Sequence, residues 1–173
     1  MGFWNCVAYL AVIGLLSFFA GRMLPKGLFK GTYFPFKGYS FERDGRIYER
    51  LYIKRWQNKV PDMSRIFPKL IPRKQLRGTD PAYLTEMIQE ACIAELIHLL
   101  LCIAGLRCIW LWPGIGGKGI AALNILGNMV FVVIQRYNRP RFINLRNNVE
   151  KKFKQKENCY ACADPQLQYG RGT

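Results

Sequence analysis

Side chains able to do chemistry interrupt one of the most apolar runs of the sequence, residues 90–106. His98, the only histidine of the chain, follows Glu95 by three residues, and Glu90 begins the run. On an α-helix, side chains three residues apart share a face. An ionisable group inside a membrane costs about 2.5–3.5 kcal/mol on insertion scales, so such groups are candidates for function. We predict that Glu90, Glu95 and His98 are catalytic, with His98 as a general base.

Two roles remain open for Glu95. It can set the tautomer of His98, as carboxylates do in base–carboxylate pairs, or it can be the counter-ion of nearby arginines. Glu90 is a second candidate partner for His98, two helical turns away. The alternative to catalysis is that these polar groups hydrogen-bond to neighbouring membrane helices and only fix their packing.

A second polar cluster, residues 135–141, follows the last apolar segment of the chain. Arginine binds phosphate and carboxylate groups through two parallel hydrogen bonds. Arginines beside a membrane segment are often simple anchors, but this cluster also contains a tyrosine and two amides. We interpret it as a substrate-binding site with five candidate residues: Gln135, Arg136, Asn138, Arg139 and Arg141.

Three apolar segments must position these groups. They predict an all-α integral membrane protein with about three transmembrane helices, near residues 4–22, 90–110 and 117–137. Two tryptophans and a Pro/Gly run between the last two segments are typical of a hairpin tip at the membrane interface. We interpret the first segment as a retained anchor rather than a signal peptide, because no basic region precedes it. A soluble three-helix protein is disfavoured, since so short a chain could not bury three such segments.

The charge distribution predicts the orientation. The net charge is +15, and Lys and Arg outnumber Asp and Glu by 15 to 7 in residues 22–90 and by 9 to 3 in residues 135–173. By the positive-inside rule, the loop 22–89 and the C-terminal tail are cytoplasmic and the N-terminus is outside, in the cell membrane. Anionic inner-leaflet lipids are the nearest partners for these cations. A phosphorylated cofactor is a second partner, and nucleic acid is disfavoured.

Shorter elements complete the predicted architecture. The spacing of apolar residues in 47–56 predicts a helix with one buried face, and Asp80 followed by Pro81 predicts the start of a helix. Pro140 is expected to interrupt the chain, so that residues 142–156 form a basic amphipathic helix on the inner leaflet. Residues 1–157 then make a single membrane-embedded catalytic domain, and residues 158–173 make a flexible tail. No metal site is expected from Cys159 and Cys162 in this tail, because a second ligand pair is missing.

The run from Glu90 to His98 and the cluster 135–141 resemble motifs of the glycosyl-4,4'-diaponeurosporenoate acyltransferases, small membrane enzymes of staphyloxanthin-type carotenoid biosynthesis. The likeness covers roughly residues 22–145. Further matches upstream are Phe41, Glu42, Gly45, Trp56, Lys59 and Asp62. The resemblance implies transfer of a fatty acyl chain, from acyl-CoA as co-substrate and with no bound cofactor, to a hydroxyl of a glycosylated lipid. It also implies that Trp56 and Lys59 belong to the substrate-binding site.

Two other functions are compatible with the residues alone. One is a non-enzymatic membrane interaction protein, in which the polar groups fix helix packing. The other is a transferase with a phosphorylated donor, a nucleotide or a prenyl phosphate, because an arginine cluster recognises phosphate rather than an acyl chain.

Overall fold

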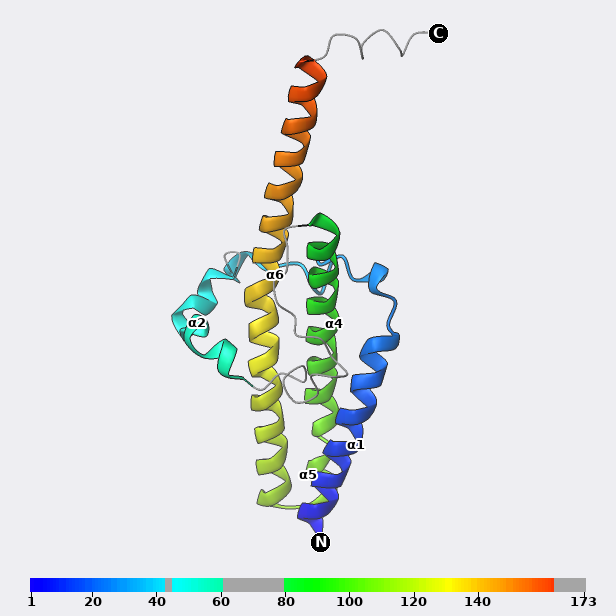
Figure 1. Cartoon of the computed structure of the whole chain (residues 1–173). Helices are drawn as coiled ribbons and strands as arrows, with labels where there is room; N and C mark the ends of the chain where they lie inside the picture. Colours follow the sequence, from blue (N-terminus) through cyan, green and yellow to red (C-terminus); the bar gives the residue numbers. More distant parts are fainter. Residues whose placement is uncertain (43–44, 61–79, 164–173) are drawn as a thin grey trace.

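Three long helices dominate the computed structural model, which describes residues 1–42, 45–60 and 80–163 (Figure 1). They are α1 (Gly2–Met23), α4 (Pro81–Gly105) and α6 (Ile115–Ala163). All three are long and apolar enough to cross a membrane, and no strand occurs in the described ranges. These observations confirm the predicted all-α class with three helices of spanning length.

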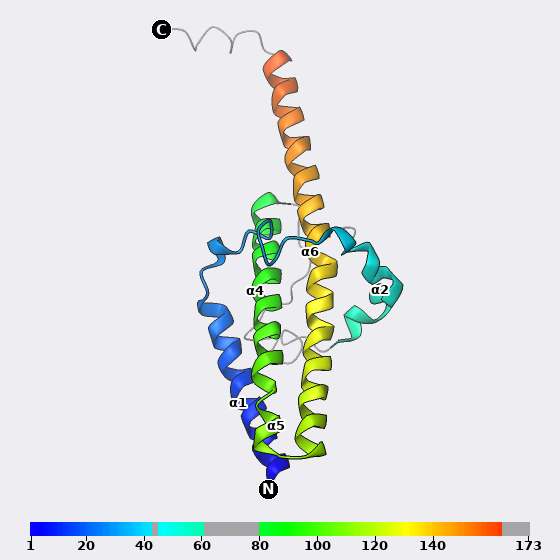
Figure 2. The ribbon, with the colours of Figure 1, turned by 180° about the vertical axis from the view of Figure 1, so that it is seen from behind.

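The helices α4 and α6 form an antiparallel hairpin (Figures 1 and 2). The helix α4 begins at Pro81, as predicted, and the short helix α5 (Cys108–Leu111) and a Pro/Gly turn lead from it into α6. The first helix packs along α4, and near its start the ring of Phe3 meets that of Trp112 edge-on at 6.1 Å. The N-terminus and the hairpin tip therefore lie at one end of the bundle, which is the relative arrangement that the predicted topology requires.

Apolar side chains cover the outside of this bundle. In the most apolar stretch of each helix, only 6% of the residues in α1, 28% in α4–α5 and 17% in α6 are buried inside the protein. Val12, Leu15, Leu16 and Phe19 of α1 are all more than half exposed. A helix that is apolar all round is typical of a buried or membrane-spanning segment, and the described chain does not bury these faces itself.

Close contact between α4 and α6 depends on a glycine. A Cβ atom at Gly105 would lie 2.0 Å from Nδ2 of Asn124, so any larger residue there would displace the Asn124 side chain. The Asn124 amide donates a hydrogen bond to the Leu101 carbonyl at 3.0 Å. Small residues and amides that bond across the interface are the usual means by which apolar helices pack in membranes.

Between α1 and α4, the described residues form only short helical turns. They are η1 (Lys26–Leu28), η2 (Ser40–Glu42), η3 (Arg46–Leu51), α2 (Ile53–Trp56) and η4 (Gln57–Lys59). The prediction of one helix over residues 47–56 is wrong, because Tyr52 adopts a left-handed conformation with φ of 51° and breaks the helical path. Ile53 is fully buried, whereas Ile47 and Leu51 are exposed.

The predicted interruption at Pro140 is also absent, since α6 continues through it. Proline removes one helical hydrogen bond, but ion pairs on both sides hold this part of α6 in place: Arg136 with Glu42, Arg139 with Glu95 and Arg141 with Glu49. The basic stretch 142–156 therefore extends α6 instead of forming a separate helix. The predictions for Asp62, for residues 164–173 and for the side chains of Cys159 and Cys162 fall outside the described part of the chain.

Candidate active site

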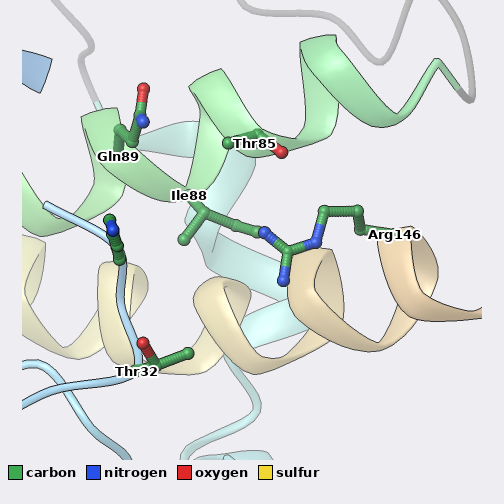
Figure 3. Close-up of a pocket in the computed structure, with 6 residues that line it drawn as sticks. Thr32, Thr85, Ile88, Gln89 and Arg146 are labelled. Carbon is green, nitrogen blue, oxygen red and sulfur yellow. The ribbon is translucent and has the colours of Figure 1, made fainter. Parts of the chain in front are cut away.

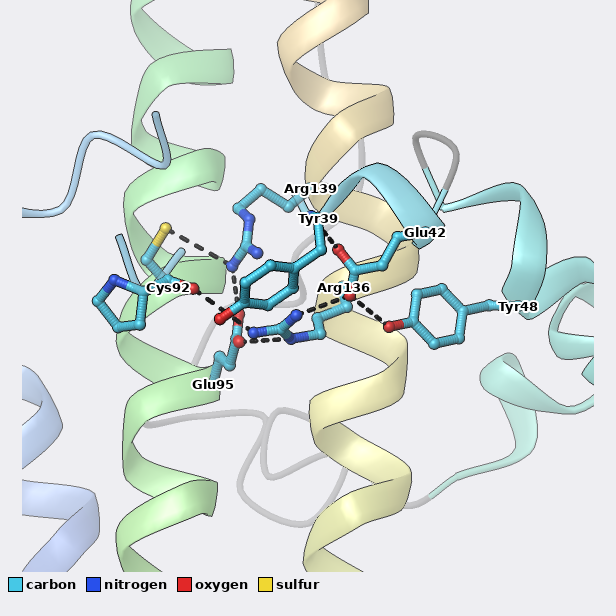
Figure 4. Close-up of polar contacts among 8 residues, drawn as sticks. Tyr39, Glu42, Tyr48, Cys92, Glu95, Arg136 and Arg139 are labelled. Atoms are coloured by element: carbon cyan, nitrogen blue, oxygen red, sulfur yellow. Dashed lines mark hydrogen bonds and ion pairs between the residues drawn. The ribbon is translucent and has the colours of Figure 1, made fainter. Parts of the chain in front are cut away.

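Buried ion pairs join α4 to α6 (Figure 4). The Glu95 carboxylate accepts hydrogen bonds from Arg136 Nε, at 2.7 Å, and from Arg139. Glu95 and Arg139 are only 1% and 2% exposed. Because Arg136 and Arg139 are three residues apart on α6, both can face the same carboxylate. Two guanidinium groups on one carboxylate require a second anion to balance their charge.

Glu42 of η2 supplies a second carboxylate. Its Oε1 accepts hydrogen bonds from Arg136 at 2.6 Å and from the Tyr48 hydroxyl at 2.6 Å, and its Oε2 accepts one from the Tyr39 N–H at 2.9 Å. The Arg136 guanidinium also lies over the Tyr39 ring, 5.0 Å from its centre. Arg136 thus bridges Glu42 and Glu95 and ties the loop to the helical hairpin (Figure 4).

The environment fixes the charge states of the loop side of this network. Burial alone would raise the pKa of the Glu42 carboxyl, but hydrogen bonds from Tyr48, Arg136 and the Tyr39 amide outweigh it and hold this pKa below its ordinary value of 4.5. Burial and the bond to Glu42 raise the pKa of Tyr48 to about 12. At neutral pH, Glu42 is therefore an anion and Tyr48 is a neutral hydrogen-bond donor.

Gly45 lets the loop approach α6 beside this network. Its φ is +84°, and a Cβ atom there would lie 3.2 Å from the Tyr137 carbonyl oxygen and 3.5 Å from that of Arg136. Pro140 has no N–H to donate to the Arg136 carbonyl, which lies four residues earlier. The loop therefore packs on the turn of α6 that the proline leaves without one of its hydrogen bonds.

His98 lies one turn of α4 further toward the hairpin tip. Its Nδ1 is 2.9 Å from Oδ1 of Asn128, and its ring stacks on Phe131 with centres 4.6 Å apart and planes 5° from parallel. The Asn128 Nδ2 donates to the Asn124 carbonyl oxygen at 2.9 Å and to Asn124 Oδ1 at 3.1 Å. The side chain is half-buried between two apolar helices.

This arrangement selects one tautomer of His98. Because the amide nitrogen of Asn128 makes two donor contacts to Asn124, its oxygen is the atom that faces the imidazole and can only accept. Nδ1 of a neutral His98 must then carry the proton, which leaves the lone pair on Nε2. An imidazole oriented in this way can act as a general base through Nε2.

The three residues predicted to be catalytic occupy three different environments. His98 bonds to Asn128, whereas Glu95 is the counter-ion of the two arginines, the second of its two open roles. Glu90 lies nearer the start of α4, where it pairs with Lys26 at 3.0 Å. The contact that sets the tautomer of His98 is therefore made by Asn128 and not by a carboxylate. Whether these residues are catalytic stays a prediction.

The residues predicted to bind substrate are dispersed. Arg136 and Arg139 point their guanidinium groups at carboxylates, and Gln135 and Asn138 are half-buried on α6. Arg141 pairs with Glu49 at 2.7 Å and lies over the Tyr137 ring, 3.5 Å from its centre.

Trp56 and Lys59 belong to a different part of the molecule. The Trp56 Nε1 donates to the Leu51 carbonyl at 2.7 Å, and Lys59 is exposed. Figures 1 and 2 show α2, which contains Trp56, on the side of α6 away from α4, so these two residues are not gathered with His98.

Three members of the site were not predicted as site residues: Glu42, Tyr48 and Asn128. Asn128 had a usable signal, because an amide four residues after Asn124 in an apolar segment must find a partner. Glu42 appeared only among the residues that resemble the acyltransferase motifs, and nothing in the sequence singled out Tyr48.

The fold and site together define a small helical protein with three helices long and apolar enough to cross a membrane, and with an oriented histidine held between two of them. A sequence model of the glycosyl-4,4'-diaponeurosporenoate acyltransferases matches residues 32–148. The enzyme of that name from Staphylococcus aureus strain Newman is 26% identical over 156 residues, which cover 85% of this chain and 89% of the relative. That of strain N315 is 27% identical over 149 residues, or 81% and 85% of the two chains. No solved structure is a significant match.

The chain therefore belongs to the glycosyl-4,4'-diaponeurosporenoate acyltransferase family. This membership confirms the resemblance and makes the chain an acyltransferase, the class of enzyme that the sequence predicted.

Proposed function

We propose that this acyltransferase works in a membrane and moves a fatty acyl chain from acyl-CoA to a hydroxyl of a glycosylated lipid. The acceptor is the glycosyl-4,4'-diaponeurosporenoate in the name of its relatives, or a lipid of the same class. The loop and the C-terminal end of α6 face the cytoplasm in this proposal, because both are strongly basic. The observation that carries the proposal is His98, which Asn128 holds with Nε2 as proton acceptor.

The transfer needs a base but no bound cofactor. His98 Nε2 takes the proton of the acceptor hydroxyl as the hydroxyl oxygen attacks the carbonyl carbon of the thioester. A C–O bond forms, the C–S bond breaks, and the departing thiolate of CoA takes the proton from the imidazolium. Asn128 and the parallel ring of Phe131 keep the imidazole in place. We assign the contacts with the sugar to the half-buried amides Gln135 and Asn138.

The contacts of the arginines bear on the alternative of a phosphorylated nucleotide or prenyl donor. That alternative depends on Arg136 and Arg139 as phosphate ligands, but both cations already face Glu95, and Arg136 also faces Glu42. We therefore favour the acyl thioester as donor and give these two arginines the task of positioning α6 against α4.

Substitution of His98 and its partner tests the proposal. We expect His98→Ala and His98→Gln to insert normally and to lower kcat by about 10²–10⁴, the usual contribution of a general base. Asn128→Ala should lower kcat by about 2- to 10-fold with little change in KM, since it removes one orienting hydrogen bond. The control is Asn148→Ala, which changes an exposed amide of the same helix.

The readout is mass spectrometry of the acylated glycolipid formed by equal amounts of each variant. Near-normal transfer by well-folded His98→Gln would reject His98 as the base. His98 and Asn128 would then serve only the packing of α4 against α6.

A further inference from the structure

A small cavity opens between α4, α6 and the chain that follows η1 (Figure 3). Its volume is about 210 Å³, and its lining consists of Lys30, Thr32, Thr85, Ile88, Gln89 and Arg146. Figure 3 shows the Arg146 side chain extending from α6 toward Ile88 of α4. The cavity is smaller than the pockets of about 300–1,000 Å³ that enclose drug-sized ligands. It therefore suits a compact head group and not an acyl chain.

The cavity is lined by two cations and no carboxylate. Within the described residues, Lys30 has no ion pair, and Nε of Arg146 is buried without a hydrogen-bond partner. Arg146 makes an ion pair with Glu150 on the same helix, but their closest atoms, Nε and Oε1, are 3.6 Å apart, which is longer than a hydrogen bond, and the Glu150 side chain is 47% exposed. These cations differ from Arg136 and Arg139, which are hydrogen-bonded to a buried carboxylate.

Uncharged donors complete the lining. The Thr32 hydroxyl and the Gln89 amide can each donate a hydrogen bond to an anion. Thr85 already donates its hydroxyl proton to the Pro81 carbonyl at 2.8 Å, so it can only accept from a ligand. A tetrahedral oxyanion, which takes several donors from different directions, matches this set better than a carboxylate does.

We propose that this cavity binds a phosphate group, carried either by the acyl donor or by an anionic lipid. Lys30 and Arg146 supply the charge, and Thr32 and Gln89 supply further hydrogen bonds. The choice between the two sources rests on the proposed function, but the phosphate site itself does not.

Distance favours the donor as the source. Gln89 lies nine residues before His98 on α4, which is about 13–14 Å along the helix axis. The pantetheine arm of CoA joins its phosphate to its sulfur through about 13 bonds. Fully extended it spans about 15 Å, because three bonds of an extended backbone span about 3.3–3.6 Å. A phosphate in the cavity thus leaves a thioester within reach of the level of His98.

Binding of phosphate-bearing probes to the full chain in a neutral detergent tests this site. By isothermal titration calorimetry, CoA is compared with pantetheine, which lacks phosphate. In mixed micelles, phosphatidylglycerol, a net anion, is compared with phosphatidylcholine, whose phosphate charge is balanced by its choline group. The variants are Lys30→Gln, Arg146→Gln and the double substitution, and the control is Lys151→Gln, which removes an exposed cation of α6 outside the cavity.

We expect the Kd of the phosphate probe to rise about tenfold or more in each single variant, since a charge-assisted hydrogen bond is lost, and to stay unchanged in the control. Binding of CoA but not of pantetheine identifies the donor as the source, and binding of phosphatidylglycerol alone identifies a lipid head group. Both results support the site. Failure of every phosphate probe to bind the unaltered protein, or unchanged binding by the double variant, would overturn it.

CoA and pantetheine carry no acyl chain to transfer, and the lipid probes are not acyl thioesters, so this test is independent of catalysis. His98→Gln should bind CoA as tightly as the unaltered protein does. A protein that binds phosphate in the cavity but transfers no acyl chain would keep the site and reject the proposed function. If Lys30→Gln and Arg146→Gln changed neither acyl transfer nor CoA binding, the phosphate site would be rejected and the proposed function would stand.

Discussion

Replacing Glu95 by glutamine tests whether the buried ion pairs hold the hairpin together. The substitution keeps the size of the side chain and removes its charge. Arg139, 2% exposed, then faces no carboxylate among the described residues, whereas Arg136 keeps Glu42 at 2.6 Å. Removing one partner of a buried ion pair costs about 3–5 kcal/mol, because the remaining charge is uncompensated. Since only one guanidinium loses its sole carboxylate, we expect a decrease of that size in the free energy of unfolding, and not twice as much.

Chemical denaturation in detergent micelles, followed by circular dichroism, measures this decrease. The matched control is Glu86→Gln on the same helix, where the carboxylate is 51% exposed and pairs with Lys26 at 2.5 Å. An exposed pair contributes about 0–1 kcal/mol. Adding Arg139→Gln to Glu95→Gln should restore part of the stability, because the unpaired charge disappears. Equal, small losses for Glu95→Gln and Glu86→Gln would refute the reasoning.

Two further substitutions examine the loop. Tyr48→Phe should cost less than the roughly 1.5–3 kcal/mol of a hydrogen bond to a buried charge, because Tyr48 is only half-buried. Because the pKa of folded Glu42 is lowered, its ionised form stabilises the fold above the ordinary pKa of 4.5, and this contribution is lost as the pH falls below 4.5. The variant lacks the Tyr48 bond that helps to lower this pKa, so it should lose less stability on acidification. Tyr48 has an ordinary pKa of 10 and a pKa of about 12 in the fold, so the unaltered protein should lose stability as the pH rises from 10 to about 12. The variant should lack this loss, and identical pH profiles of stability for the two proteins would contradict this reasoning. Gly45→Ala should destabilise by about 1–2 kcal/mol, since φ is +84° and the new Cβ would crowd the Tyr137 carbonyl. In contrast, Gly14→Ala, where a Cβ meets nothing, should be neutral or slightly stabilising in the same chemical denaturation assay.

The helices were predictable because composition alone determines them. The span expected at 4–22 corresponds to α1 (Gly2–Met23), and the other two lie within α4–α5 and α6. The ends were less predictable. Proline is a strong signal for a helix end, but its effect at Pro140 is overridden by tertiary ion pairs on both sides. The prediction of one helix over residues 47–56 was wrong because the spacing of apolar residues gives no sign that Tyr52 adopts a left-handed conformation.

The pairing of polar groups was only half predictable. The sequence places Glu95 and His98 on neighbouring positions of one helix, but the partner of each comes from α6. Which residue of α6 stands opposite depends on the register of the two antiparallel helices, and that register is set by packing such as that of Gly105 against Asn124. The pairing of Glu42 with Arg136 is even harder to predict, because Glu42 lies in an irregular segment 94 residues away in sequence.

The contacts of the cations also explain where an anionic substrate group can bind. An arginine bonded to a buried carboxylate offers a phosphate little net charge, so the Arg136–Arg139 pair is better suited to hold α4 and α6 together. Arg146 lies two helical turns beyond Arg139, about 10 Å along α6, and its Nε has no hydrogen-bond partner in the described structure. In the proposed orientation, this displacement moves the anion site toward the aqueous, loop-bearing end of the hairpin. A charged head group can enter there without crossing the apolar layer, while the chain attached to it extends along α4 toward His98.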